Sequence, residues 1–247
     1  MAQNTFVRSA ALIAGPLLLG LIGGVGGFML ASRHAAPPES TAASDKAIHD
    51  YLLAHPEVLP QAMDKLRSRT DAQQLAGVAG KLETPFVGAV LGNPAGRITL
   101  VEFSDFACGY CRQSVADVEA LIAAHPDLRV VVRQLPIITP RSADAARMGL
   151  AAAEQGRYPA FHKAMYAAGG VDEASIAAAA TAAGLDSARA AAFITDPRVA
   201  AEIDANLGYA RELGIEGTPA WVIGRQKIVG AVGRDALEAA ITSASKS

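Results

Sequence analysis

The chain of 247 residues contains two cysteines, Cys108 and Cys111, separated by Gly109 and Tyr110. Two thiols at this spacing can form a local disulfide, exchange disulfides with another molecule, or bind a soft ion such as Cu(I). A disulfide that closes so small a ring constrains little of the unfolded chain, so stabilisation is a poor reason for the pair. A structural zinc site normally needs four ligands, and the sequence has no second cysteine pair and no histidine pair at finger spacing. The pair favours redox chemistry over a passive bridge where a strand, a turn and a helix surround it.

The elements around the pair support this interpretation. Residues 98–103, Ile-Thr-Leu-Val-Glu-Phe, form an apolar run typical of a buried strand, and apolar residues at helical spacing follow Cys108 as far as His125. Cys108 is thus expected at a helix N-terminus, where free backbone N–H groups and the helix dipole stabilise a thiolate. We expect Cys108 to be the nucleophile. Cys111, one turn on, is expected to attack a mixed disulfide formed at Cys108 and to leave a Cys108–Cys111 disulfide.

Glu102 is the third candidate catalytic residue. It precedes Cys108 by six residues and alternates with Val101 and Phe103, which directs it toward the domain interior beneath the predicted helix. A carboxyl group buried there has a raised pKa and would exchange a proton with Cys111 during its attack. The alternative is a solvated glutamate at the edge of a sheet.

Composition limits the classes of function. The formal net charge of −2 supplies no basic field for nucleic acid, so no nucleic-acid partner is expected. The chain is rich in alanine and poor in aromatic residues, which predicts much helix packed through small side chains. No cofactor is expected. No metal site is expected either, apart from the alternative of Cu(I) bound by Cys108 and Cys111.

The N-terminal part predicts export. Residues 10–31 are apolar and uncharged between Arg8 and Arg33, and about 20 helical residues are enough to cross the roughly 30 Å core of a bilayer. We expect residues 1–34 to be a signal anchor that holds the protein at the periplasmic side of an inner membrane. A signal segment that is cleaved to release a secreted protein is the alternative. Residues 35–43 have the composition of a linker.

Residues 44–82 predict a short helical arm. Apolar residues fall at helical spacing from Ser44, a plausible N-cap, to His55 and again after Pro56, which predicts two helices broken near this proline. Pro60 favours a kink or a later start of the second helix. The narrow apolar stripe must pack either on its own domain or against copies of itself, so residues 44–75 are a candidate site of homo-oligomerisation.

The motifs together resemble a known family. Residues 101–106, Val-Glu-Phe-Ser-Asp-Phe, then Cys-Gly-Tyr-Cys, and later Gly217-Thr218-Pro219, resemble the DsbA-like branch of the thioredoxin superfamily from about Pro85 to the C-terminus. The resemblance implies an α/β thioredoxin-like fold over residues 83–247, with an inserted all-helical subdomain of about five helices at about residues 141–213. It also implies a cis Thr218–Pro219 bond beside the cysteines. That loop, with Gly109 and Tyr110, would bind the backbone of an extended substrate.

Two finer resemblances bear on the direction of the reaction. Residues 51–59 look like the N-terminal segment of ScsC-type proteins, which are copper-associated DsbA relatives, some of them trimeric through this region. Gly-Tyr between the cysteines and Thr before the proline occur together in DsbC-type isomerases. Without a histidine between the cysteines, the reduced form is less stabilised and the protein is a weaker oxidant.

These resemblances imply a disulfide isomerase or reductase for exported proteins with cysteines, served by a membrane redox partner. A DsbA-like disulfide-forming oxidase and a Cu(I)-binding copper-tolerance protein are the alternatives. His162 lies in a Phe-His stretch that the family shares. A single histidine on a helix is more often structural, so it is left out of the predicted site.

Overall fold

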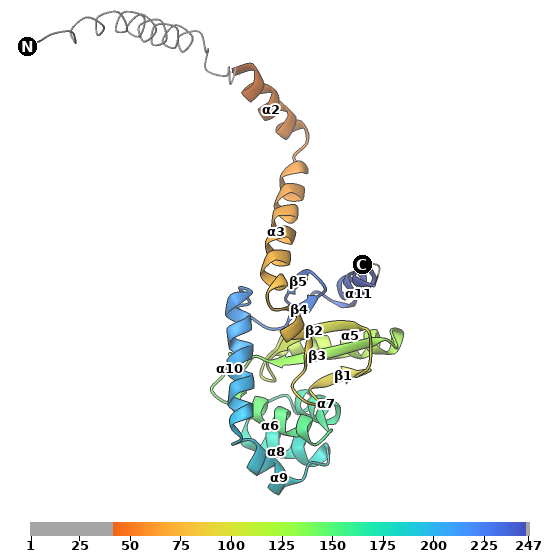
Figure 1. Cartoon of the computed structure of the whole chain (residues 1–247), viewed down its shortest axis with the longest axis vertical. Helices are drawn as coiled ribbons and strands as arrows, with labels where there is room; N and C mark the ends of the chain where they lie inside the picture. Colours follow the sequence, from red (N-terminus) through yellow and green to blue (C-terminus); the bar gives the residue numbers. More distant parts are fainter. Residues whose placement is uncertain (1–41, 246–247) are drawn as a thin grey trace, which may run out of the picture. The chain divides into compact units, whose positions relative to one another are not determined.

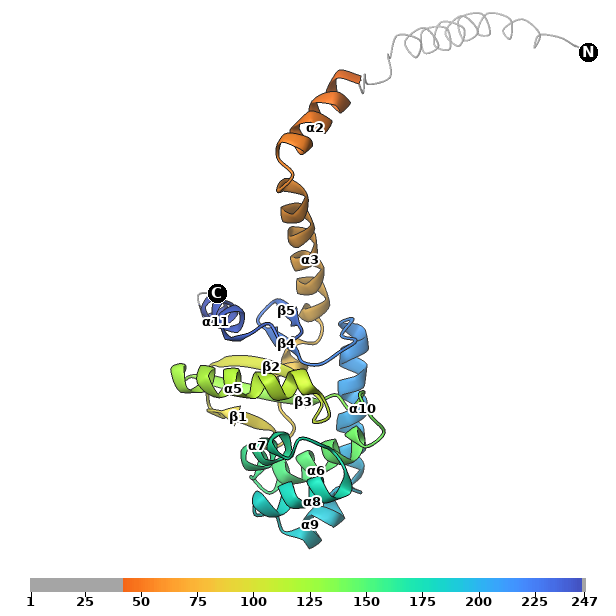
Figure 2. The same cartoon turned by 180° about the vertical axis from the view of Figure 1, so that it is seen from behind.

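The computed structural model describes residues 42–245 (Figures 1 and 2). The chain divides into two compact units, Met1–Gln61 and Ala62–Ser247. The predicted anchor, residues 10–31, lies outside the described residues, as does most of the predicted linker. No helix within residues 42–245 is both long enough and apolar enough to span a bilayer.

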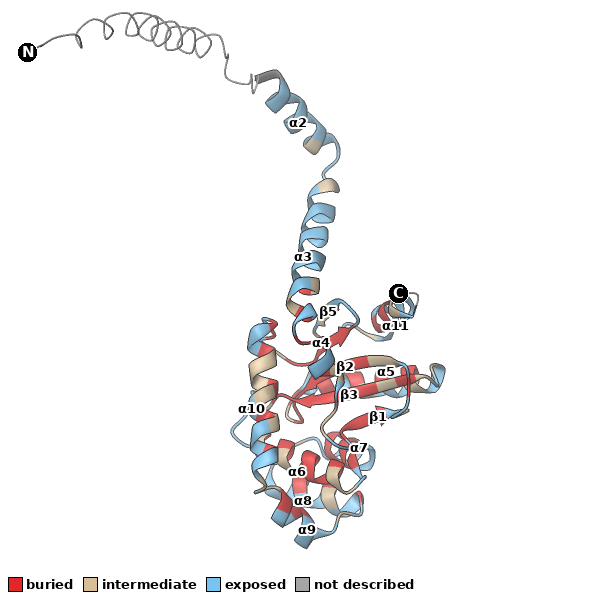
Figure 3. Cartoon of the chain, viewed as in Figure 1, coloured by how far each residue is buried: buried red, intermediate tan, exposed pale blue. Residues whose placement is uncertain are grey.

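The arm contains two helices separated near Pro56, as predicted. Helix α2 covers Ala42–Ala54, so it begins two residues before the expected cap at Ser44. Helix α3 covers Val58–Ala76 and therefore starts before Pro60, not after it. A proline in the first turn removes no helical hydrogen bond, because the first four N–H groups of a helix have no partner within it. Figure 3 shows that α2 and the first turns of α3 are largely exposed.

The second unit is built on a five-stranded sheet with the order β1-β3-β2-β4-β5. Strands β2 and β3 are parallel and are joined by helix α5, whereas the other pairs are antiparallel. The strand predicted at residues 98–103 is confirmed as β2; the edge strand β1 was not predicted. The strands are β1 Val90–Gly92, β2 Ile98–Ser104, β3 Leu128–Gln134, β4 Ala220–Ile223 and β5 Gln226–Val229.

Helices cover both faces of this sheet. Helix α5, Gly109–Ala124, and helix α11, Arg234–Ala244, pack with Leu100 on one face. Figure 2 shows α5 lying across this face of the sheet. Helix α4, Ala79–Glu83, the end of α3, and helix α10, Pro197–Glu212, pack with Val101 and Phe103 on the other. Because side chains alternate along a strand, Glu102 and Ser104 share the face of Leu100 beneath α5.

The predicted helical insertion is confirmed, with five helices between β3 and β4. Four of them gather beside the edge strand β1 (Figure 1): α6 Ser142–Glu154, α7 Tyr158–Ala168, α8 Glu173–Ala182 and α9 Ser187–Phe193. Phe106, just before the cysteines, packs edge-on against Phe161 at 5.6 Å between ring centroids. A Cβ atom at Gly149 would lie 3.1 Å from the Phe106 ring, so this glycine makes room for the aromatic contact. The insertion is thereby joined to the loop that carries Cys108.

A buried arginine fastens α4 and α10 to the sheet. Arg133 on β3 donates hydrogen bonds to the carbonyl oxygens of Leu82 and Thr84, at the C-terminal end of α4. It also forms an ion pair with Glu202 on α10, at 2.8 Å. A buried guanidinium is tolerated because its donors are paired in this way. One side chain therefore links three elements of the second unit.

Candidate active site

Cys108 occupies the position at a helix N-terminus that the sequence predicted. It is the N-cap residue of α5, and its Sγ accepts a hydrogen bond from the backbone N–H of Cys111 at 3.4 Å. Both cysteines carry free thiols in the structure. The N–H groups of the first turn and the positive end of the helix dipole face this sulfur, an arrangement that favours negative charge on it.

The loop before β4 lies directly against this cysteine. The Thr218–Pro219 peptide bond is cis, as the family resemblance implied. The Cys108 thiol donates a hydrogen bond to the carbonyl oxygen of Thr218 at 3.2 Å. Residues 110 positions apart in the chain thus meet at one sulfur atom. The structure therefore brings together the two segments that the resemblance assigned to chemistry and to substrate binding.

Cys111 lies deeper than Cys108, with only 1 % of its surface exposed. Burial raises the pKa of its thiol to about 12, and the neighbouring Glu102 carboxylate adds to the rise. Hydrogen bonds from the Asp105 backbone and the Ser104 hydroxyl lower it by less. The thiol is therefore protonated at neutral pH, and its attack on a disulfide needs a base.

Glu102 provides a carboxyl group next to this thiol. The structure places it inside the domain, 2 % exposed, rather than at a solvated edge. Its strand neighbours are Val132 on β3 and Trp221 on β4. Burial raises the pKa of the carboxyl to about 7, while a hydrogen bond with Ser104 opposes the rise. Near neutral pH the group therefore exists in both protonation states, which suits proton exchange.

Two hydroxyl groups that the sequence reasoning missed complete a buried polar network. The Ser104 hydroxyl lies 2.7 Å from the hydroxyl of Tyr166 on α7. The Tyr166 hydroxyl in turn donates to the backbone carbonyl oxygen of Asp105 at 3.1 Å. Strand alternation would have placed Ser104 beside Glu102. No local signal would have identified Tyr166, because it comes from the inserted subdomain.

The carboxylate of Asp105 fixes the loop that leads to Cys108. One of its oxygens accepts the N–H of Ala107 at 2.9 Å, and the other accepts the N–H groups of Ile137 and Ile138, each at 2.9 Å. The segment after β3 is thereby tied to the loop before the cysteines. Between the cysteines, Tyr110 is 65 % exposed, so it is available to a substrate.

His162 is near the network but is not part of a hydrogen-bonded chain to the cysteines. Its ring packs against Tyr166 and Phe106, with centroids 4.9 and 6.0 Å apart. Burial lowers its pKa to about 4, so it is neutral at physiological pH. These contacts are those of a packed core residue.

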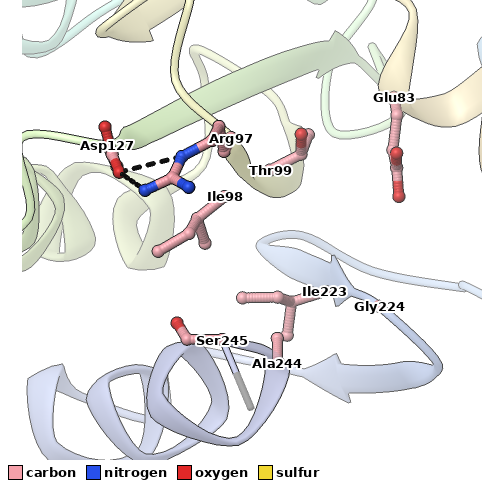
Figure 4. A pocket seen from close by; sticks show the side chains of 9 residues that line it. All are labelled: Glu83, Arg97, Ile98, Thr99, Asp127, Ile223, Gly224, Ala244 and Ser245. Carbon is pink, nitrogen blue, oxygen red and sulfur yellow. Dashed lines mark hydrogen bonds and ion pairs between the residues drawn. The ribbon is translucent and has the colours of Figure 1, made fainter. Parts of the chain in front are cut away.

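No cluster of three or more potential metal ligands occurs among the described residues. A hollow of about 340 Å³ opens at the start of β2, where Ile98 and Thr99 line it (Figure 4). The ion pair of Arg97 with Asp127, 2.5 Å long, borders this hollow. Cys108 follows the opposite end of the same strand, so this hollow is separate from the thiols.

Comparison with known proteins identifies the relatives of both parts of the chain. The model of the DSBA-like thioredoxin domain matches residues 99–242, and that of the copper resistance protein ScsC N-terminal domain matches residues 41–73. A thioredoxin-like oxidoreductase from Silicibacter pomeroyi is 39 % identical, with a TM-score of 0.62 over 64 % of this chain and 92 % of that one.

Two further solved structures are similar. A periplasmic thioredoxin-like protein from Salmonella enterica serovar Typhimurium is 30 % identical, with a TM-score of 0.63 over 69 % of this chain and 97 % of that one. A linker-deletion mutant of Proteus mirabilis ScsC is 26 % identical, with a TM-score of 0.66 over 85 % and 99 % of the two chains.

The curated relatives are Na(+)/H(+) antiporters. The antiporter NhaA 1 of Salinispora arenicola is 31 % identical over 150 residues, which are 60 % of this chain and 23 % of the antiporter. The chain thus spans about a quarter of the length of the curated relatives that it matches.

Proposed function

Because the chain belongs to the family of DsbA-like thioredoxin domains, which are thiol-disulfide oxidoreductases, we propose that it acts as a disulfide isomerase or reductase on exported proteins that contain cysteines. One observation carries the proposal. The Cys108 thiol lies at the N-terminus of α5 and against the carbonyl oxygen of Thr218, in the cis-proline loop. A nucleophilic sulfur and a backbone edge that can pair with an extended peptide are thus adjacent.

The geometry supports a two-step exchange. The Cys108 thiolate attacks a substrate disulfide, forms a mixed disulfide, and releases the other substrate sulfur as a thiolate. The substrate backbone is held beside the Thr218–Pro219 loop while Gly109 and Tyr110 contact it. In isomerisation the released substrate thiolate attacks another substrate disulfide, and Cys108 is finally displaced. In reduction Cys111 attacks Cys108 instead and leaves a Cys108–Cys111 disulfide.

The residues between the cysteines support the reducing or isomerising direction. Gly109 and Tyr110 bring no cation and no imidazole to the Cys108 sulfur. Within the described residues, the hydrogen bond that Sγ accepts is the 3.4 Å contact from the Cys111 N–H. A strong oxidant owes its potential to a stabilised thiolate in the reduced form. Fewer stabilising groups favour a weaker oxidant.

The arm supports assembly with further copies of the chain. Leu59, Met63 and Leu66 follow helical spacing on α3 and are all more than half exposed. Ile48 and Tyr51 form a similar exposed pair on α2. Large apolar side chains at this spacing are typical of a seam between helices. We propose that a second copy of the arm covers them, which would place several Cys108 thiols in one particle.

We also propose an extracytoplasmic location. The uncharged residues 10–31 would anchor the chain in an inner membrane, and a membrane redox partner would keep Cys108 reduced. The similarity to a periplasmic thioredoxin-like protein supports the compartment. Disulfides form and persist there because the environment is oxidising, so a reduced Cys108 needs such a partner.

The decisive test compares two activities of the same full-length protein, together with the measured reduction potential of its cysteine pair. We expect the reduced protein to reactivate a substrate with scrambled disulfides faster than the oxidised protein introduces disulfides into a reduced substrate. We expect Cys108→Ser to abolish both activities. Faster oxidation than isomerisation would instead identify a disulfide-forming oxidase. Tight stoichiometric Cu(I) binding without thiol-disulfide turnover would identify a copper-binding module.

The assembly is tested separately on the exposed face of α3. Serine substitution of Leu59, Met63 and Leu66 together should lower the mass measured by sedimentation and reduce isomerisation. Gln61→Ser, at an exposed polar position of the same helix, is the matched control and should change neither. An unchanged mass in the triple variant would exclude this face as the seam.

A further inference from the structure

The hydroxyl groups of Ser104 and Tyr166 each have a single proton to donate, and they have more than one acceptor. Tyr166 lies within hydrogen-bonding distance of two oxygens, Ser104 Oγ at 2.7 Å and the Asp105 carbonyl at 3.1 Å. Ser104 shares a face of β2 with Glu102, and its hydroxyl influences both the Glu102 carboxyl and the Cys111 thiol of α5. The direction of each hydrogen bond therefore depends on whether Glu102 carries a proton.

Two arrangements of the hydrogen bonds are compatible with these donors and acceptors. With Glu102 protonated, its O–H donates to Ser104, Ser104 donates to Tyr166, and Tyr166 donates to the Asp105 carbonyl. With Glu102 ionised, Tyr166 donates to Ser104, and Ser104 donates to the carboxylate. Each state of Glu102 is thus matched by a rotation of two hydroxyl hydrogens, without movement of any heavier atom.

The network is closed to solvent. Ser104 is 1 % exposed and Tyr166 is 3 % exposed, and the strand neighbours of Glu102 are apolar or aromatic. Cys111 is itself only 1 % exposed, so its proton leaves into this buried network and not directly into bulk water. The ionisable groups that interact with Glu102 are Cys111 from α5 and Tyr158 and Tyr166 from α7. Both tyrosine hydroxyls have a raised pKa because they are buried, so Glu102 is the acid-base group of this set near neutral pH.

We propose that Ser104 relays the proton of Cys111 to Glu102, and that Tyr166 is a positioning residue that lets the Ser104 hydroxyl reverse its direction. The inference rests on the proposed role of the two cysteines. The Cys111 S–H bond breaks, its proton moves to Ser104 Oγ, and the proton of Ser104 moves to the Glu102 carboxylate. The electron pair of the Cys111 sulfur forms the bond to Cys108 Sγ, and the bond from Cys108 to the substrate sulfur breaks. The substrate leaves as a thiolate, and its disulfide has been reduced by the two cysteines.

The relay also neutralises the Glu102 carboxylate while the Cys111 thiolate is forming. The Glu102 carboxylate holds the pKa of Cys111 high, so its neutralisation makes the developing Cys111 thiolate less unfavourable. The transfer that removes the proton from Cys111 therefore also removes the negative charge of Glu102 that opposes ionisation of Cys111.

The two thiol steps can be observed separately with an aromatic disulfide whose released thiolate absorbs visible light. The first equivalent released reports attack by Cys108, and the second reports resolution by Cys111. In stopped-flow experiments on the full chain from about pH 5 to about pH 9, Ser104→Ala should leave the first release unchanged. It should slow the second about tenfold or more and remove the inflection near pH 7. Tyr166→Phe should slow the second release less and should shift that inflection.

Two further variants separate relay from packing. Ser104→Thr restores a hydroxyl and should recover most of the second rate. Ser114→Ala removes another buried hydroxyl, one that donates to the Tyr110 carbonyl on α5, and should alter neither release. Fluorescence of the buried Trp221 checks the fold of each variant. If Ser104→Ala does not fold, the relay is tested by whether Tyr166→Phe shifts the inflection in the pH profile of the second release.

An unchanged second rate and pH profile in Ser104→Ala, or an unshifted inflection in Tyr166→Phe where that variant decides, would overturn the relay. Loss of the second release in Ser104→Thr equal to that in Ser104→Ala would also overturn it. The Cys111→Ser variant tests the proposed function itself, separately from the relay. If Cys111→Ser releases the second equivalent as fast as the native chain, Cys111 does not resolve the mixed disulfide, whatever Ser104 does.

Discussion

Replacement of Glu102 by glutamine tests the electrostatic reasoning directly, because glutamine has nearly the same shape and no charge. In the folded chain burial raises the pKa of Glu102 from 4.5 to about 7. In the unfolded chain the carboxyl returns to water and to its usual pKa. The folded state therefore holds a proton that the unfolded state has lost between about pH 4.5 and pH 7. Over this interval the free energy of unfolding falls as the pH rises.

The size of the effect follows from the same two values. At about 1.4 kcal/mol for each pH unit, the difference corresponds to about 3 kcal/mol. The stabilising contribution is complete below about pH 4.5 and is lost as the pH passes through about 7. Glu102→Gln has no such titration. Relative to the native chain, the variant should gain about 3 kcal/mol of stability between pH 4.5 and pH 8.

Urea denaturation of the reduced proteins at several pH values, followed by Trp221 fluorescence, measures this difference. The comparison cancels groups that titrate alike in the two proteins, such as His162, whose pKa burial lowers to about 4. Glu212→Gln, at an exposed carboxyl group on α10, is the matched control and should give a flat difference. A difference between native chain and Glu102→Gln that stays constant within about 1 kcal/mol from pH 4.5 to pH 8 would refute the reasoning.

Three other predictions concern the scaffold of the site, and all are measured by urea denaturation. Arg133→Met should destabilise the second unit by about 3 to 5 kcal/mol, because it leaves Glu202 and the end of α4 without their buried partner. Gly88→Ala should be destabilising by more than about 1 kcal/mol, since the residue has a φ of 82° and a Cβ atom would lie 2.2 Å from the carbonyl oxygen of Ala153. Gly208→Ala, in the middle of α10 with no atom near the added Cβ, should instead stabilise by about 0.5 to 1 kcal/mol.

The elements around the cysteines were predictable because their signals are local. A mainly apolar run identifies β2, and three of the five inserted helices follow aspartates whose side chains cap them, namely Asp172, Asp186 and Asp196. Helix ends are marked by glycines with positive φ, such as Gly184. The edge strand β1 escaped prediction because it has only three residues and depends on its pairing with β3. The expected later start of α3 was wrong because Pro60 lies in the first turn of this helix, where a proline removes no helical hydrogen bond.

The candidate site was predictable only in part, and the division has a physical cause. Glu102 stands out in the sequence because a carboxylate interrupts the apolar pattern of a buried strand, which conflicts with the local rule for such strands. Such a conflict points to a group retained despite its cost, about 3 kcal/mol above pH 7 for the ionised carboxylate. The polar partners around the buried carboxylate do not all come from nearby sequence. Tyr166, whose hydroxyl completes the network around Ser104, is 62 residues away in the chain.

The role of the insertion follows from this separation. Phe106 is held by Phe161 and Tyr166, so α7 positions the loop before Cys108 as well as the hydroxyl beneath Cys111. A change in how α7 packs would therefore alter the protonation of Glu102 without any change in the cysteine motif. The dipeptide Gly109-Tyr110 adjoins the sulfur at the helix N-terminus, whereas α7 contributes a hydroxyl to the network around Glu102, the proposed proton acceptor of Cys111. Proteins with the same motif but a different α7 are accordingly expected to differ in the pH dependence of resolution more than in the reactivity of the first thiol.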